Sequence, residues 1–197
     1  RNNFYAISRV HKSMRAIEGS NVANRESMLG ELKTLRAYFY FDLIRVFKNI
    51  PYFDETVDDP SSVSPYQYSR DEIFGFIKQD LREAYFAMPE KQQDKGRFNK
   101  YVAAALMAKV SAFTASLNNS QQDWEEVITY ADYVIGSGQY ELYPNFLDMS
   151  KVEFDNTYES IMAIQFAVTA DNAHYNYPNM LNCTISEGNL YGQGDDF

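Results

Sequence analysis

Apolar residues recur at steps of three and four along most of the first 140 residues, which is the spacing of amphipathic helices. The longest such stretch covers residues 31–51. Its apolar stripe consists of Leu32, Leu35, Phe39, Leu43 and Val46. Further aromatic side chains widen this stripe, so we expect the helix to be buried on more than one side. Pro51 cannot continue a helix and favours an extended Ile50, which predicts that the helix ends just before it.

One further helix is predicted on each side of this one in the sequence. The first covers residues 2–18, and a Gly-Ser-Asn turn separates it from the long helix, for which Asn24 or Ser27 is the candidate cap. The other covers residues 69–88, because Ser69 and Glu72 have the spacing of a capping box. Its apolar face consists of Ile73, Ile77, Leu81, Ala84 and Met88.

Two further helices follow, with a short turn at residues 118–120 between them. The apolar face of the first consists of Val102, Leu106, Val110, Phe113 and Leu117. Alanines make its other faces small, so that a neighbouring helix can approach closely. The face of the second consists of Trp124, Val127 or Ile128, Ala131 and Ile135. Such a pair is typical of a tetratricopeptide hairpin, and residues 69–88 with the helix before them predict a second pair.

The predicted fold class is therefore mainly all-α, with tetratricopeptide-like helical hairpins and an irregular, loop-rich C-terminal segment. Residues 51–68 are rich in Pro, Ser and Asp and are predicted to form a loop, and residues 159–166 alternate weakly, as in a short strand. We divide the chain into a helical scaffold, 1–150, and the start of an irregular ligand-binding region, 151–197. Neither end closes an element, so we expect a fragment truncated at both ends.

Composition narrows the possible partners. The chain has 197 residues, a formal net charge of −9 and no basic cluster, so we expect no nucleic-acid partner. No apolar run approaches the roughly 20 residues of a membrane span, and no signal peptide is recognisable. The single cysteine, Cys183, excludes an intrachain disulfide.

The sequence contains no pattern typical of catalysis, so we expect a protein that is not an enzyme and has no cofactor. His11 and His174 are far apart and have no carboxylates at metal-ligand spacing, which argues against a metal site. Cys183 has no basic neighbour to activate it. Acidic pairs occur at residues 58–59 and 195–196, but glycoside hydrolysis needs two carboxylates across a cleft. Phosphate loops, nucleophile elbows and HExxH motifs are also missing.

Aromatic residues in the predicted loops give a functional hint. In the first long loop they are Tyr52, Phe53, Tyr66 and Tyr68. In the last segment they are Tyr175, Tyr177 and Tyr191, with Asn172, Asn176 and Asn189 nearby. Tyrosine rings stack on the apolar faces of sugars, and asparagine amides hydrogen-bond to hydroxyls. The alternative is that each of these tyrosines packs against residues missing from the chain.

Six motifs in order resemble the SusD/RagB family of surface nutrient-binding lipoproteins. The signature helix LRAYFYFDLIRVF covers residues 35–47 and is followed by Asn49-Ile50-Pro51. The other five are YSRDEIF with a later Asp-Leu pair (68–81), GRFNK (96–100), AAALMAKV (103–110), the stretch from Asp123-Trp124 to Leu142, and that from Asn156 to Phe166. Each motif alone is ordinary, whereas their order is specific.

The resemblance implies a protein that is lipid-anchored to the outer membrane of a Bacteroidetes-type bacterium, at the cell surface. Such a protein binds an oligosaccharide or peptide nutrient and delivers it to a SusC-like TonB-dependent transporter, without chemistry. The lipid anchor lies outside this chain. Because the segment after the last motif contributes to the ligand cleft in this family, Asn172, Tyr175, Tyr177 and Tyr191 are the candidate ligand-binding residues. The alternative function is a tetratricopeptide-like scaffold that binds a protein or peptide and no small ligand.

Overall fold

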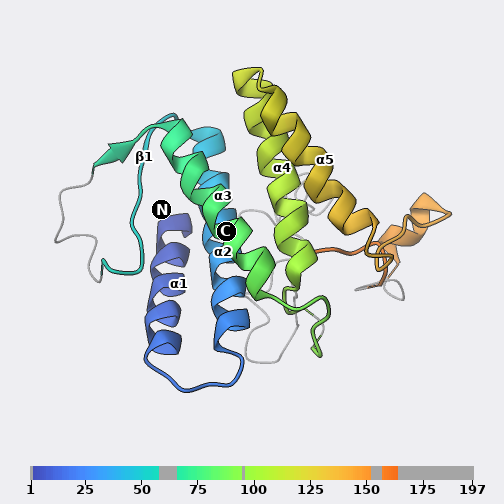
Figure 1. The fold of residues 1–197 in the computed structure, drawn as a ribbon, viewed down its shortest axis with the longest axis horizontal. Coiled ribbons are helices and arrows are strands. Elements are labelled where there is room, and N and C mark those ends of the chain that lie inside the picture. Colours follow the sequence, from blue (N-terminus) through green and yellow to red (C-terminus); the bar gives the residue numbers. More distant parts are fainter. Residues whose placement is uncertain (1, 58–65, 95, 152–156, 164–197) are drawn as a thin grey trace, which may run out of the picture. The chain divides into compact units, whose positions relative to one another are not determined.

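Five α-helices make up most of the part of the chain that the computed structural model describes, which is residues 2–57, 66–94, 96–151 and 157–163 (Figure 1). They are α1 (Asn2–Glu18), α2 (Arg25–Val46), α3 (Arg70–Ala87), α4 (Lys100–Asn118) and α5 (Gln121–Ile135). Each helix packs against the one before it in the sequence. The predicted all-α, tetratricopeptide-like class is confirmed.

The chain divides into two compact units, residues 1–162 and 163–197. Only Ala163 of the second unit is among the described residues, so the five helices all belong to the first unit. The boundary at residue 150 between scaffold and ligand-binding region stays a prediction.

Helix α1 forms over the predicted residues and buries one face. Ile7, Val10, His11 and Met14 are buried, and they lie at the expected steps of three and four. Asn24 occupies the N-cap position of α2, but its side chain makes no capping hydrogen bond. The predicted start of α2 is therefore correct, although the side-chain cap on which this prediction was based does not form.

The buried face of α2 differs from the predicted stripe. Its centre consists of Ala37, Tyr40, Phe41 and Ile44, which lie at positions i, i+3, i+4 and i+7. Of the predicted stripe only Leu43 is buried, while Leu32, Leu35 and Phe39 are half-buried and Val46 is exposed. The buried side includes the charged Arg36, whose charge is neutralised by α3. The spacing of apolar residues alone does not predict that a charged residue such as Arg36 is buried. Burial on more than one side is confirmed, because α2 contacts α1, α3 and α4.

Helix α3 begins with the predicted capping box. The Ser69 amide donates to Glu72 Oε2 at 2.8 Å, and the Glu72 amide donates to Ser69 Oγ at 3.4 Å. The five predicted apolar positions of this helix are all buried. Near its end, α3 approaches α2 so closely that a Cβ atom on Gly30 would lie 2.8 Å from Met88 Cγ. A side chain at position 30 would therefore force Met88 to shift.

Helices α4 and α5 form the predicted hairpin. Asn119 has φ +49° and ψ +43°, a left-handed conformation that asparagine tolerates, and it ends α4. Ser120 Oγ then accepts the Asp123 amide at 3.2 Å and starts α5. The fully buried Ala103, Ala104 and Ala115 provide the small contact surface expected of α4.

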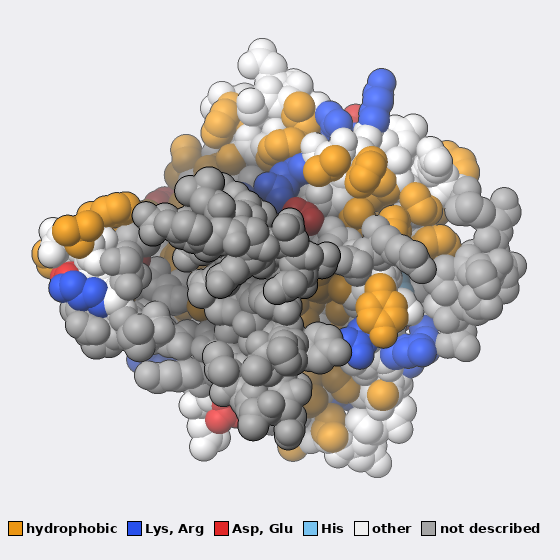
Figure 2. Space-filling view, turned by 180° about the vertical axis from the view of Figure 1, so that it is seen from behind, with side chains coloured by type: hydrophobic (Ala, Val, Ile, Leu, Met, Phe, Trp, Pro, Cys, Tyr) orange, Lys and Arg blue, Asp and Glu red, His pale blue; other side chains and the backbone are white. Residues whose placement is uncertain are grey.

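The predicted apolar face of α5 is wrong in part. Tyr130 and Val134 are the buried residues, whereas Trp124, Ile128 and Ile135 are exposed. The reason is a polar contact with α3. Lys78 Nζ lies 2.6 Å from Asp123 Oδ1 and 2.6 Å from Glu126 Oε2, and these pairs direct the acidic side of α5 inward. Hydrophobic side chains also reach the surface on the face of the molecule in Figure 2.

Two predictions for irregular regions need correction. The segment predicted as a loop contains two short antiparallel strands, β1 (Ile50–Pro51) and β2 (Gln67–Tyr68), with Ile50 opposite Tyr68. The predicted strand at 159–166 is absent from its described residues, 159–163, which form turns and bends. There the Glu141 amide donates to the Tyr158 carbonyl at 3.1 Å and the Tyr143 amide donates to Glu159 Oε2 at 2.6 Å, so the contact uses a side chain as well as the backbone. A 3₁₀ helix, η2 (Phe146–Ser150), precedes this segment.

Candidate functional site

Four aromatic side chains lie together where the chain leaves β1 and returns through β2. Tyr52 stacks on Phe76 of α3, with ring centroids 4.2 Å apart and an interplanar angle of 22°. Tyr68 meets both rings edge-on, at 6.2 Å from Tyr52 and 5.4 Å from Phe76. Tyr66 lies edge-on to Tyr68 at 4.8 Å, and 64% of its surface is exposed. We call these four residues the aromatic ledge.

The local sequence explains the arrangement of the ledge. Residues two apart on an extended chain point to the same side, so Tyr66 and Tyr68 project together. The pairing of Ile50 with Tyr68 brings the start of the preceding segment, and hence Tyr52, to the same place. Tyr52 and Tyr68 are half-buried and mainly support the surface, which leaves the Tyr66 ring as the most accessible part of the ledge.

The segment after β1 is fixed to the helices by a buried phenol. Tyr40 of α2 donates its hydroxyl hydrogen to the Phe53 carbonyl at 3.1 Å and accepts the Phe53 amide at 2.9 Å. Burial raises the pKa of Tyr40, which keeps the hydroxyl protonated and able to donate. Two residues further on, the Glu55 carbonyl accepts from Arg15 Nη1 at 2.8 Å. The ledge is therefore attached to a rigid support.

A buried ion pair lies beneath this segment. Arg36, 4% exposed, donates from Nε and Nη2 to the two oxygens of Asp80, each at 2.7 Å, and Asp80 is 5% exposed. Arg36 Nη1 also pairs with Glu55. Burial would lower the pKa of Arg36, but the hydrogen bonds and charge of Asp80 outweigh it and raise that pKa above its usual value. Burial raises the pKa of Asp80, and Arg36 counteracts this rise. The group is a structural ion pair joining α2, α3 and the loop.

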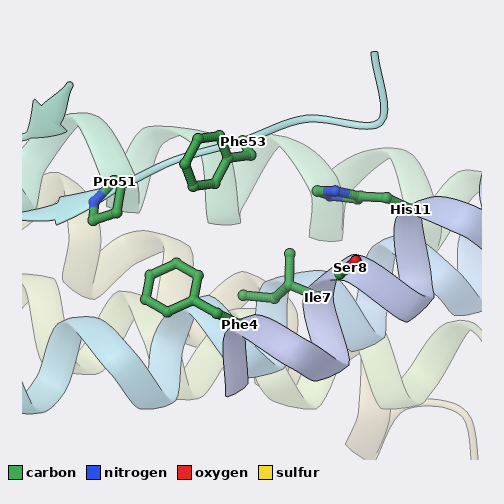
Figure 3. A pocket seen from close by; sticks show the side chains of 6 residues that line it. All are labelled: Phe4, Ile7, Ser8, His11, Pro51 and Phe53. Carbon is green, nitrogen blue, oxygen red and sulfur yellow. The ribbon is translucent and has the colours of Figure 1, made fainter. Parts of the chain in front are cut away.

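A cavity of about 260 Å³ lies between α1 and the chain at and after β1 (Figure 3). Its described lining consists of Phe4, Ile7, Ser8, His11, Pro51 and Phe53. His11 is 2% exposed, and its Nε2 has no hydrogen-bond partner among the described residues. Burial, followed by the charge of Arg36, lowers the pKa of His11 to about 4, so the ring is neutral at pH 7.

This cavity is poorly suited to a sugar. A pyranose has several hydroxyl groups, and each needs a polar partner when it is removed from water. Among the described lining residues only Ser8 and His11 have polar side chains. A glycan would be better accommodated at the ledge, where the Tyr66 side chain is exposed to water.

The candidate residues of the last segment are not described by the structure. Asn172, Tyr175, Tyr177 and Tyr191 lie outside the described residues and stay predictions, as do His174 and Cys183. Of the first-loop aromatics, the structure brings Tyr52, Tyr66 and Tyr68 together, while Phe53 lines the cavity instead.

Sequence reasoning missed two neighbours of the ledge, Phe76 and Arg70. Phe76 is a half-buried residue of α3 that supports Tyr52, and no local pattern distinguishes it from an ordinary helix residue. For Arg70 a signal was present, because Tyr66, Tyr68 and Arg70 alternate along the chain, as residues on one side of a strand do.

The part of the chain with described coordinates has no group of three His, Cys, Asp or Glu residues able to hold a metal ion. Nor is any of its helices long and apolar enough to cross a membrane. The acidic pairs at 58–59 and 195–196 lie outside the described residues. What the described surface offers a ligand is exposed aromatic area with polar groups around it.

Comparison with known proteins identifies the family. The model of the SusD-like family, described as starch-binding and associating with the outer membrane, matches residues 2–112. The match covers more than half of the chain, and the chain therefore belongs to the SusD-like family. A SusD-like protein from Bacteroides ovatus is 30% identical over 151 residues, which are 73% of this chain and 27% of that protein.

Two solved structures extend the comparison. A protein crystallised with a xylogluco-oligosaccharide is 25% identical with a TM-score of 0.74, over 84% of this chain and 34% of that protein. A laminarin-binding SusD-like protein is 26% identical with a TM-score of 0.71, over 81% of this chain and 35% of its own. The chain thus spans about a quarter to a third of the length of these proteins.

Proposed function

We propose that this protein binds a glycan at the cell surface and delivers it to a SusC-like TonB-dependent transporter. The main support is membership of the SusD-like family together with similarity to proteins solved with, or named for, a glycan. In this proposal the protein is lipid-anchored in the outer membrane of a Bacteroidetes-type bacterium, and its role consists of binding and release without a chemical step.

The aromatic ledge supports glycan binding on physical grounds. The exposed ring of Tyr66 offers an apolar face to the C–H groups of a sugar, and its hydroxyl can both donate and accept. Stacking of Tyr52 on Phe76 and the fixed Phe53 backbone hold this surface in place, so little ordering is needed on binding. We propose the ledge as a glycan-binding surface of the first unit, and Asn172, Tyr175, Tyr177 and Tyr191 stay separate candidate residues predicted from the sequence.

The binding test uses the full-length protein and isothermal titration against xyloglucan, laminarin, starch and an acidic pectic oligosaccharide. The double variant Tyr175→Ala/Tyr177→Ala should weaken binding of the best ligand about tenfold while the circular dichroism of the helices stays unchanged. Tyr5→Ala is the control, because Tyr5 is an exposed tyrosine on α1 that belongs neither to the ledge nor to the predicted candidate residues.

Two outcomes would contradict the proposal. If no glycan binds while a peptide library yields a ligand, the protein is a tetratricopeptide-like peptide-binding scaffold. If glycan affinity is the same in the double variant and in Tyr5→Ala, then Tyr175 and Tyr177 are not in the site. Transporter delivery is tested separately, by purification in mild detergent from the native membrane, where a TonB-dependent barrel should co-purify.

A further inference from the structure

The ledge has a cation beside it with no partner among the described residues. Arg70 makes no hydrogen bond or ion pair with any of them, and its Nε is buried away from solvent without an acceptor. Arginine of this kind is unusual because a buried donor without a partner costs stability. The Arg70 side chain as a whole is half-buried, so a ligand would meet the terminal guanidinium nitrogens rather than Nε.

The backbone places Arg70 on the same side of the chain as Tyr66 and Tyr68. Tyr68 lies in β2, and Ser69 is extended, with φ −66° and ψ 161°. Side chains two apart along extended residues share a side, and their Cα atoms are roughly 7 Å apart. Tyr66, Tyr68 and Arg70 therefore follow one another at this spacing, which forms a row of two aromatic rings and one guanidinium.

The acidic side chains next to Arg70 in the sequence have other partners. Glu72 accepts from the Ser69 amide at 2.8 Å and from the Ser69 hydroxyl at 2.7 Å. Asp71 Oδ1 accepts from Asn118 Nδ2 at 3.4 Å. The charge of Arg70 thus stays available to an anion from outside.

We propose that the ledge and Arg70 together select a glycan that contains uronic acid. This inference rests on the proposed glycan-binding function and specifies its ligand class. A planar carboxylate matches the forked donors of a guanidinium and makes short, charge-assisted hydrogen bonds, whereas a neutral hexose offers Arg70 no anion. The pyranose ring that bears the carboxylate lies at Tyr68, next to Arg70, and a neighbouring sugar of the same glycan stacks on Tyr66. The chain's net charge of −9 repels a polyanion at long range, but at 0.15 M salt this repulsion is screened beyond about 8 Å.

The test compares two matched ligands on the full-length protein. One is an oligogalacturonate, and the other is the same oligosaccharide with its carboxyl groups reduced to alcohols. Isothermal titration at 0.15 M salt should give about tenfold tighter binding of the uronate. Arg70→Gln should reduce uronate affinity to that of the reduced sugar, while Tyr66→Ala should weaken both. Arg82→Gln is the control, since Arg82 is an exposed arginine of the same helix that already pairs with Glu126.

The outcomes separate this inference from the proposed function. Equal affinity for the two ligands, or an Arg70→Gln variant that binds the uronate as tightly as the unchanged protein, would overturn the inference. If neutral glycans bind and the uronate does not, the inference is wrong and glycan binding stands. If no glycan binds at all, both fail. Thermal unfolding of Arg70→Gln, which should match that of the unchanged protein, ensures that a loss of affinity reflects the lost cation.

Discussion

Arg36 and Arg70 are two arginines with opposite surroundings. Arg36 is buried in the middle of α2 and shares its donors between Asp80 and Glu55. Arg70 begins α3 next to the aromatic ledge and has no partner among the described residues. Charge alone therefore does not distinguish a structural arginine from one that is free for a ligand. The distinction depends on whether the fold supplies acceptors for the guanidinium.

The two arginines also mark two different roles within the first unit of the chain, support of the fold and binding of a ligand. The Arg36 ion pair joins α2, α3 and the loop after β1, and it supports the ledge from beneath. At the ledge itself, the exposed ring of Tyr66 and a cation without a described partner are left for binding. A rigid scaffold with an unsatisfied surface is the arrangement expected of a preorganised binding site.

The largest effect should follow from breaking the buried pair. Asp80→Ala leaves the Arg36 guanidinium buried without its main partner, and we expect a loss of about 3–5 kcal/mol in the free energy of unfolding. Urea unfolding of the full-length protein measures this loss. Glu90→Ala is the control, because Glu90 is largely exposed where it pairs with Lys100 at 4.0 Å, and this pair should contribute about 1 kcal/mol or less. Equal losses in the two variants would show that the buried pair stabilises the fold no more than a surface pair does.

A second effect depends on pH and concerns the neighbour of this pair, His11. Its pKa is lowered to about 4 in the folded state, against about 6.5 in the unfolded chain. Between these values only the unfolded chain binds the proton, so acidification from pH 6.5 towards pH 4 should destabilise the fold by up to about 3 kcal/mol. The contribution of the neutral ring is fully present above pH 6.5.

The measurement for His11 is the difference in unfolding free energy between pH 7 and pH 4.5. The variant His11→Leu has no group that titrates at this position, so its pH dependence should be smaller by the contribution of His11. The carboxylates titrate in both proteins, so their contributions to the pH dependence cancel in the comparison. Identical pH profiles would mean that His11 is already accessible to protons in the folded state.

The helices could be predicted from the sequence because their signals are local. The capping box at Ser69 and the turn at 118–120 involve residues within three or four positions of each other, and the structure places both as expected. The buried faces of α2 and α5 could not be predicted in the same way. They depend on the pairing of Arg36 with Asp80, 44 residues apart, and of Lys78 with Asp123, 45 residues apart. Arg36 and Asp80 are buried, and Lys78 and Asp123 are half-buried, although their hydropathy indicates the surface.

The same reason explains what could be predicted of the site. The tyrosines of the first loop were recognised by type, and their alternation predicts which of them share a side. Their support by Phe76 and the fixing of Phe53 by Tyr40 are contacts between separate elements. The unpaired state of Arg70 among the described residues is likewise a property of the assembled fold, since it depends on where Glu72 and Asp71 find their own partners.

The smallest expected effect tests the comparison of the two arginines directly. Because Arg70 has no partner to lose among the described residues, Arg70→Gln should change the free energy of unfolding by no more than about 0.5 kcal/mol. The neighbouring variant Ser69→Ala removes the cap of α3 and should cost about 1 kcal/mol, which provides an internal standard in the same urea series. A loss for Arg70→Gln larger than that for Ser69→Ala would reveal a structural role for Arg70. In that case both arginines would serve the fold, and Arg70 would not be free for a ligand.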